Sequence, residues 1–236
     1  MIKKVQLLLV RRPDVSLGQL EAHLASEGQR VRGSVPRGGR HRRLLRVHDD
    51  PTRQSAHGQE MSSADTPFDA VFEVGGEEMD LGDLVSAVKD VGTRLGDWID
   101  PVRSAAIAGM EHVIVPGSQR LELVFALRRL PALSPEQFRD HWLNVHAEIA
   151  RGIGALQGYR QFHADDQHSE AAAASAGVGV ADFEGAAEAY YQNSEAFLKI
   201  MSEPAVAADA LADERTFIDH SRSVLGLYRT VWDSAV

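Results

Sequence analysis

The chain has 236 residues, and its second half repeats the pattern of its first half. The stretch that begins at Val5 reads VQLLLVRRPDVSLGQLEAHL, and the stretch that begins at Leu123 reads LVFALRRLPALSPEQFRDHW. Each has an apolar run, two arginines, a turn with proline, a serine and an amphipathic segment. A repeat with a fixed spacing indicates that both halves form the same supersecondary unit, which excludes most folds for a chain of this length.

The remaining segments predict one order of elements in both halves: strand, helix, strand, strand, helix, strand. We expect the third strand at 67–76 in the first half and at 177–185 in the second half. The second helix is expected at 78–95 and at 188–201. This order is that of the split βαβ, or ferredoxin-like, unit.

One such unit leaves a face of its sheet uncovered, and two units can cover each other. We therefore predict an α+β fold of two ferredoxin-like (βαββαβ) units, residues 1–117 and 118–236, which pack sheet to sheet around a barrel-like core. The segments 49–66 and 165–177 lie between the second and third strands of the units and consist of polar or small residues. We expect both to be mobile surface loops or lids.

The composition excludes several classes of protein. Because the chain has no cysteine, it has no disulfide, zinc–thiolate site, iron–sulfur cluster or cysteine nucleophile. No apolar run approaches the roughly 20 residues of a membrane span. Arg11 and Arg12 interrupt the apolar start, so we read it as a strand and expect a cytoplasmic protein that does not bind a membrane. The chain has no glycine-rich phosphate loop and no nucleophile elbow, and we predict no cofactor.

The net charge of −9 is unevenly distributed along the chain. Residues 1–57 contain 12 Lys or Arg and five acidic residues, and seven arginines lie within 30–46 without an acid. Such a run can bind nucleic acid, but this one lacks aromatic residues that stack on bases. We interpret it as a solvated loop that leads into a strand, and we predict no nucleic-acid partner.

Ser134 and Gln137 have the spacing of a capping box, and Pro135 suits the first helical position, so a helix is predicted to begin here. On an α-helix, His141 and His146 lie about 140° apart. We therefore expect that they do not share a metal ion, and we predict no metal site. One narrow face of this helix is apolar and is expected to pack on the sheet: Phe138, Trp142, Val145 and Ile149.

The second half contains a pattern F-x-x-x-W-x-x-x-H-A, then Gly-Tyr-Arg and a histidine, then Ala-Asp-Glu. These residues are Phe138, Trp142, His146, Ala147, Gly158, Tyr159, Arg160, His163, Ala212, Asp213 and Glu214, followed by Phe217 and Asp219. On these residues, segments 133–166 and 181–223 resemble the EthD family of the dimeric α+β barrel superfamily. The chain departs from the family pattern at Glu148, where the family commonly has proline.

The resemblance implies a dimeric α+β barrel within one chain, with a cavity between each sheet and its helices. Relatives in the superfamily include cofactor-free monooxygenases and cyclases that act on polyketide-like aromatics, dehydratases and muconolactone-type isomerases, and some distant barrels bind haem. The first half has Leu24 and Gly28 where the pattern has Trp142 and His146, so we interpret it as a degenerate copy. The chain is then a monomer that acts as a pseudo-dimer, or a homodimer.

The candidate catalytic residues are His146, Tyr159, His163 and Asp213. Histidine titrates near neutral pH, so His146 on the inward side of its helix is a candidate general acid/base. Tyr159 and His163 share one face of a strand and can converge with it on a substrate. Asp213, or Glu214 beside it, can orient a histidine and fix its tautomer. The candidate substrate-binding residues are Phe138, Trp142, Arg128 and Tyr190.

Three functions remain open. The first is a cofactor-independent enzyme, of monooxygenase (oxidoreductase) or dehydratase type, which uses histidine acid/base chemistry on a small apolar molecule, aromatic or polyketide-like. The second is a non-catalytic protein that binds such a molecule in the same cavity. The third is a haem-binding barrel in which His146 or His163 is the axial ligand. For Arg128, a solvated salt bridge is the alternative to binding an anionic group of the substrate.

Overall fold

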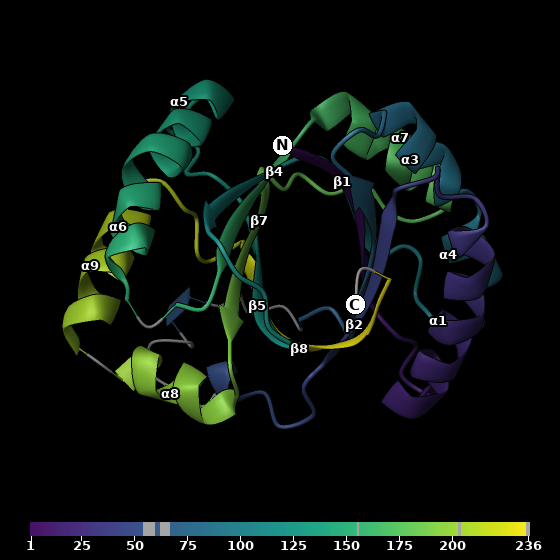
Figure 1. Ribbon diagram of the computed structural model, residues 1–236, viewed down its shortest axis with the longest axis horizontal. Coiled ribbons are helices and arrows are strands. Elements are labelled where there is room, and N and C mark those ends of the chain that lie inside the picture. The colour runs from purple at the N-terminus through teal and green to yellow at the C-terminus, as the bar shows by residue number, and fades with distance from the viewer. Residues whose placement is uncertain (54–59, 62–66, 155, 203, 235–236) are drawn as a thin grey trace.

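The computed structural model describes residues 1–53, 60–61, 67–154, 156–202 and 204–234. Eight strands of this part of the chain close into a barrel in the order β1-β3-β2-β8-β5-β7-β6-β4, and every neighbouring pair is antiparallel (Figure 1). The strands are β1 (Ile2–Leu9), β2 (Arg40–Arg46), β3 (Ala70–Gly76), β4 (Ala105–Val115), β5 (Leu121–Leu127), β6 (Tyr159–Ala164), β7 (Gly185–Tyr191) and β8 (Val224–Asp233).

The helices cover the barrel on two opposite sides (Figure 1). One side carries α1 (Leu17–Arg32), α3 (Leu81–Ala87), α4 (Val91–Arg94) and α7 (Asp166–Ala176). The other side carries α5 (Pro135–Asp140), α6 (Ala147–Gly152), α8 (Ser194–Ser202) and α9 (Pro204–Glu214). A π-helical turn, η2 (His141–His146), joins α5 to α6, and a short 3-10 turn, η1 (Pro51–Arg53), follows β2. None of the helices described is both long and apolar enough to cross a membrane.

The α+β class predicted from the repeat is confirmed, and the way in which the halves meet is corrected. The first half contributes the strand order β4-β1-β3-β2 and the second half β8-β5-β7-β6, so their relative orders agree. We expected two separate sheets stacked face to face, but β2 pairs with β8 and β4 pairs with β6 along their edges. Edge pairing satisfies the N–H and C=O groups that open sheet edges would expose.

Three segments differ from the expectation. The third strand of the second half lies at Gly185–Tyr191 rather than at 177–185, and the helix expected from 188 begins at Ser194. The helix expected at 78–95 is divided into α3 and α4 by Asp90, which has φ 59°. Within 49–66, residues 54–59 and 62–66 lie outside the described residues, so the expectation of a loop there stays a prediction.

Residues 165–177 form helix α7, where we expected a loop. Alanine is the best helix former, Asp165 accepts a hydrogen bond from the backbone N–H of His168, and Gly177 ends the helix with φ 73°. Although it belongs to the second half, α7 packs against β4 and α3 of the first half. The side chains of Ala172, Ala173 and Ala176 are buried there, and their small size permits the close approach.

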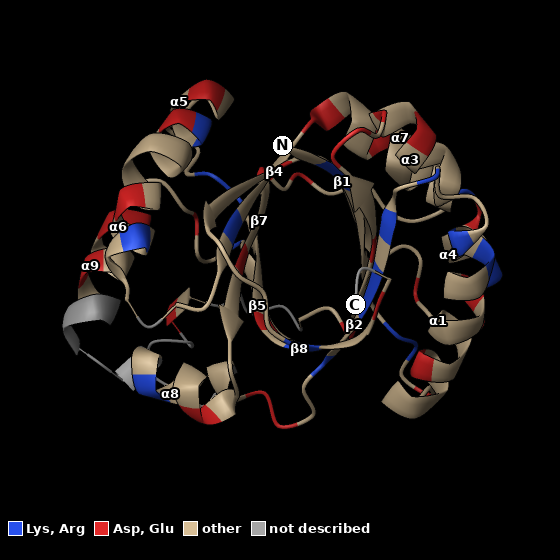
Figure 2. Ribbon diagram, viewed as in Figure 1, with Lys and Arg blue, Asp and Glu red and all other residues tan. Residues whose placement is uncertain are grey.

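The barrel interior contains charged residues, and each strand contributes at least one buried polar or charged side chain to it. These residues, the interior ring, are Lys4, Arg42, Glu73, Glu111, Glu122, Arg160, Tyr190 and Thr230. Lys4 reaches across the barrel: its Nζ lies 2.7 Å from Glu111 and 2.5 Å from Glu188 on β7. Figure 2 shows Lys, Arg, Asp and Glu on the barrel strands as well as on the outer helices.

The interior ring corrects our interpretation of the arginine run. We expected a solvated loop that leads into a strand, but Arg42 on β2 is only 3 % exposed and pairs with Glu73 and Glu122. Arg43, on the opposite face of the same strand, is also buried. Burial, together with the neighbouring carboxylates, raises the pKa of Glu188 to about 7 despite the opposing effect of Lys4. Of the seven arginines in the run, Arg42 therefore belongs to the barrel interior, whereas Arg30 and Arg32 lie on helix α1.

His41 on β2 makes the stability of the first half sensitive to acid. Its ring is buried, and neither ring nitrogen has a hydrogen-bond partner in the part of the chain described. Burial and the charge of Arg43 lower its pKa to about 4. Unfolded histidine has a pKa of about 6.5, so between about pH 6.5 and 4 the unfolded chain binds the proton and the folded chain does not. Stability is therefore lost as the pH falls through this window.

We predict that His41→Leu removes part of this acid sensitivity. Between pH 7.5 and 5, the wild-type protein should lose about 1–2 kcal/mol more unfolding free energy than the variant. Urea unfolding at the two pH values measures the difference. His48→Gln, at an exposed position beyond the same strand, is the control and should behave as wild type. Equal acid sensitivity of His41→Leu and wild type would contradict the account.

Candidate functional site

The predicted helix start of the second half is present, but the helix changes form after one turn. Ser134 and Gln137 form the capping box. From His141 to His146 the turn is π-helical, so hydrogen bonds run from residue i to i+5. Such a turn brings residues five positions apart towards one face, whereas an α-helix separates them. Our expectation that His141 and His146 lie about 140° apart, as on an α-helix, is therefore wrong, and both reach the same carboxylate.

Both histidines bind the carboxylate of Asp213 at the end of α9. His146 Nδ1 lies 2.8 Å from Oδ2, and His141 Nε2 lies 2.9 Å from Oδ1. Burial alone would raise the pKa of Asp213, but the hydrogen bonds from the two histidines outweigh it and the pKa is lowered. An ionised Asp213 accepts the Nδ1 proton of His146, so the free nitrogen of a neutral His146 is Nε2.

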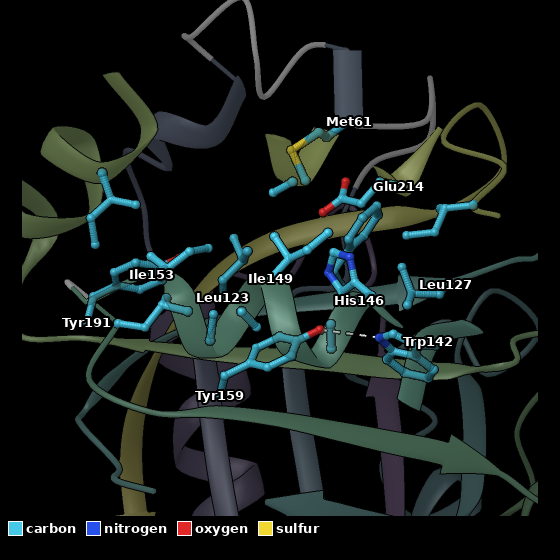
Figure 3. A pocket seen from close by; sticks show the side chains of 18 residues that line it. Met61, Leu123, Leu127, Trp142, His146, Ile149, Ile153, Tyr159, Tyr191 and Glu214 are labelled. Atoms are coloured by element: carbon cyan, nitrogen blue, oxygen red, sulfur yellow. Dashed lines mark hydrogen bonds between the residues drawn. The ribbon is translucent and has the colours of Figure 1, made fainter. Parts of the chain in front are cut away.

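His146 faces a cavity between the helices and the outer face of the second-half sheet (Figure 3). The cavity has a volume of about 100 Å3, which is room for several water molecules or one small organic molecule. No Lys or Arg is among the described residues that line it. Its apolar wall includes Leu123, Phe125, Leu127, Ile149, Ile153 and Ile200.

Tyr159 and Trp142 form one side of the cavity. Trp142 is fully buried, and its Nε1 donates a hydrogen bond of 3.3 Å to Tyr159 Oη (Figure 3). Burial raises the pKa of Tyr159 and of Tyr191 far above the usual range, and the carboxylate of Glu214 adds to the effect on both. Both hydroxyls therefore stay protonated at physiological pH, as donors of hydrogen bonds.

The structure brings three of the predicted residues to the cavity and places Asp213 directly behind His146. Trp142, His146 and Tyr159 line the cavity, and Phe138 lies behind Trp142, with 5.5 Å between their ring centroids. Phe138 is fully buried and therefore supports the helix without reaching the cavity.

The other three predicted residues lie elsewhere. His163 stacks on the face of Trp142 at 4.3 Å, outside the cavity lining, and burial lowers its pKa to about 3, so it stays neutral. Tyr190 points into the barrel, where its hydroxyl donates to Glu188. Arg128 pairs with Asp182 and lies over the ring of Phe183, as in the salt-bridge alternative.

Haem does not fit this site. A porphyrin is several times larger than the cavity that His146 faces. His163 is not among the residues that line this cavity, because Trp142 lies against it. Within the residues described, no group of three or more His, Cys, Asp or Glu side chains is arranged to hold a metal ion.

Two residues that line the cavity do not follow directly from the sequence: Glu214 is expected there only as the alternative to Asp213, and Met61 is not expected there. Glu214 is 8 % exposed, and its Oε2 accepts a hydrogen bond of 3.0 Å from His220 Nε2. Met61 comes from the first half, and its neighbour Glu60 forms an ion pair with Arg215 (Figure 3). No sequence signal links Met61 to this cavity, because the contact spans more than 150 residues and depends on the path of the chain.

The corresponding space in the first half is filled by apolar side chains. Leu20 and Leu24 of α1 pack in one buried core with Leu84 and the strand residue Phe72. Gly28 lies against His41, since a Cβ at this position would be 2.7 Å from its Nε2. The degenerate pattern of the first half thus corresponds to a packed layer that contains no counterpart of the His146 side chain.

Gly185, at the start of β7, sets the position of Trp142. Its φ is 153°, and a Cβ would lie 1.9 Å from the carbonyl oxygen of Phe162 and 3.0 Å from Trp142. We predict that Gly185→Ala lowers the unfolding free energy by about 1–3 kcal/mol through backbone strain and the clash. Urea unfolding measures this loss. Gly152→Ala, at a helix end with open space around it, should change stability by less than about 1 kcal/mol, and equal effects would contradict the account.

Comparison with known proteins gives a family match within the second half of the chain. Residues 130–221 match the family model of the EthD domain, so the predicted resemblance of the second half is confirmed. A candidate monooxygenase from Lactobacillus acidophilus has a similar structure, with 10% sequence identity, a TM-score of 0.53, and coverage of 98% of this chain and 94% of that chain. A candidate chlorite dismutase has 14% identity, a TM-score of 0.52, and coverage of 98% and 95%.

A further solved structure is an EthD family protein from Bacillus halodurans. It is 19% identical, covers 45% of this chain and 94% of its own, and has a TM-score of 0.34. A comparison with curated protein sequences gives no match. The two full-length similarities indicate a shared α+β barrel fold and carry no information about substrate.

Proposed function

We propose that the second half of this chain is a cofactor-independent enzyme that acts on a small, uncharged, apolar molecule by acid/base chemistry. The observation that carries the proposal is the position of His146, whose Nδ1 is held by Asp213 while the ring lines an apolar cavity. General acid/base catalysis by a positioned histidine typically contributes about 10²–10⁴-fold in rate. The match to the EthD domain over 130–221 supports the placement of the site in this half.

In this mechanism His146 exchanges a proton at Nε2 with the ligand. Asp213 keeps the Nδ1 proton in place and stabilises the imidazolium when Nε2 is protonated. Tyr159 and Trp142 bound the cavity and exclude water, and the hydroxyl of Tyr159 offers a hydrogen bond to a ligand oxygen. A low-polarity cavity strengthens each of these interactions.

We further propose that residues 1–117 and 118–236 are two ferredoxin-like units that arose by duplication. The equal strand orders of the halves and the repeated capping box support this proposal. The first unit then completes the barrel in place of a partner subunit and carries no site of this kind. One chain thus forms a complete pseudo-dimer.

The test uses 2-indanone, a small uncharged aromatic ketone whose acidic C–H groups exchange with solvent deuterium. We expect the protein to bind it in saturation-transfer NMR and to accelerate exchange in D2O. His146→Ala should reduce the acceleration by about 10²-fold or more while binding persists. His168→Ala, at a surface position beside Asp165, is the control.

Three outcomes would overturn the proposal. If His146→Ala exchanges as fast as wild type, the histidine has no part in the reaction. If the protein binds 2-indanone without accelerating exchange, the non-catalytic binding function is favoured instead. Failure to bind any small uncharged aromatic would remove the cavity as a ligand site.

A further inference from the structure

The cavity holds a second titratable group that the proposed mechanism does not use. Glu214 lines it directly, one residue beyond Asp213, and is almost completely buried. The two neighbouring carboxylates differ in their partners: Asp213 binds the histidines of η2, whereas Glu214 binds His220. Figure 3 shows Glu214 and His146 at the same cavity, with the Glu214 carboxylate on the side of Met61.

One carboxylate oxygen of Glu214 accepts a hydrogen bond from His220, and the other accepts none from the described residues. His220 Nε2 lies 3.0 Å from Oε2, and the His220 ring stacks on Phe125, which belongs to the cavity wall. The second oxygen is Oε1, and Glu214 is one of the residues that line the cavity. Tyr159 and Tyr191 line the same cavity as Glu214.

An imidazole and a carboxylate that face one small cavity can move protons at two positions of the same ligand. The lining contains a carboxylate and no described Lys or Arg, so it disfavours ligands with carboxylate or phosphate groups. The residues that remain, two tyrosine hydroxyls and His146, suit a ligand oxygen that accepts hydrogen bonds. A ketone meets these requirements.

We infer that Glu214 is a second catalytic residue, and that the substrate is an uncharged ketone that passes through its enol. The inference rests on the proposed function of His146. Glu214 takes the proton from the carbon beside the carbonyl, and the electron pair of that C–H bond forms the C=C bond. The carbonyl oxygen takes the Nε2 proton of the His146 imidazolium. Return of the proton to the same carbon, with the enol O–H proton passing back to His146 Nε2, regenerates the ketone with an exchanged hydrogen. In a ketone with a C=C bond one carbon further along, the enol is a dienol, and Glu214 returns the proton to its far carbon, which gives the conjugated isomer. No oxidant or reductant is needed.

Glu214→Gln tests the role of the carboxylate, because glutamine keeps the size of the side chain. We expect it to lower the acceleration of 2-indanone exchange by about 10²-fold or more, with binding unchanged in saturation-transfer NMR. Glu184→Gln, which removes a largely buried carboxylate paired with Arg129 outside the cavity, is the matched control.

The outcomes separate the two claims. If Glu214→Gln keeps the wild-type rate while His146→Ala loses it, the inference about Glu214 fails and the proposed function stands. If both variants keep the wild-type rate, the proposed function fails as well. If Glu214→Gln does not fold, Glu214→Asp, which retains the charge, is measured and should accelerate exchange more slowly than wild type, because its shorter side chain draws the carboxylate back from the ligand. Indane-2-carboxylate should bind at least ten-fold more weakly than 2-indanone, and equal binding would overturn the assignment of an uncharged substrate.

Discussion

Replacing Lys4 by methionine should lower the free energy of unfolding by about 3–5 kcal/mol, the range for removal of one partner of a buried ion pair. Lys4 is 3 % exposed, and its ammonium lies within 4 Å of Glu73, Glu111 and Glu188. Without it, these carboxylates remain buried in the barrel with less compensating charge. These buried carboxylates must then take up protons, or the barrel must rearrange to expose them, and either change destabilises the folded state.

Urea unfolding measures this loss, with Lys3→Met as the control. Lys3 is the neighbour of Lys4 and points to the opposite face of β1, so its replacement should cost less than about 1 kcal/mol. Adding Glu188→Gln to Lys4→Met should restore part of the stability, since it removes one of the uncompensated charges. A loss below 1 kcal/mol for Lys4→Met, or no restoration in the double variant, would show that the interior ring does not hold the barrel together.

Asp213→Asn should lower the acceleration of 2-indanone exchange by about 10²-fold or more, while the protein stays folded. Asparagine can present an amide N–H to His146 Nδ1, which would place the imidazole proton on Nε2 and leave no free nitrogen facing the cavity. It also removes the negative charge that stabilises the imidazolium. The exchange rate by NMR and the His146 ring signals in 15N spectra report both effects.

Asp209→Asn is the matched control for this variant. Asp209 lies on the same helix, about one turn earlier, and is exposed. We expect wild-type exchange from it. If Asp213→Asn retains the wild-type rate and the wild-type tautomer of His146, the carboxylate has only a structural role in joining α9 to η2.

Local signals in the sequence predicted much of the second half. The capping box at Ser134 is set by neighbouring residues, and the burial of Phe138 and Trp142 follows from helical spacing. The same spacing wrongly placed Val145 on the buried face, because it lies in the π-helical turn and is 46 % exposed. The π-helical turn does not follow from such spacing, because the hydrogen bonds of His141 and His146 to the distant Asp213 stabilise it. The angle of about 140° on an α-helix therefore predicts that His141 and His146 are apart, whereas both bind Asp213 in the structure.

The ion pairs inside the barrel could not be predicted from the sequence for a different reason. Arg42 and Glu122 look like solvated residues in a local window, and only closure of the barrel shows that they pair inside it. The same closure explains Tyr190, which alternates away from the cavity along β7 and points inward. Helix α7 was not predicted because its alanines produce no clear alternation of apolar and polar residues, although the helix propensity of alanine is high.

The most direct test of the central claim is a crystal structure of the protein with 2-indanone. The account predicts density in the second-half cavity, with the ketone oxygen within hydrogen-bond distance of His146 Nε2 and the ring against Leu123 and Ile149. It further predicts that the acidic carbon faces Glu214. Density inside the barrel beside Lys4 and Arg42 would contradict the claim that the second-half cavity is the site of acid/base chemistry. A ligand oriented with its oxygen away from His146 would contradict it as well.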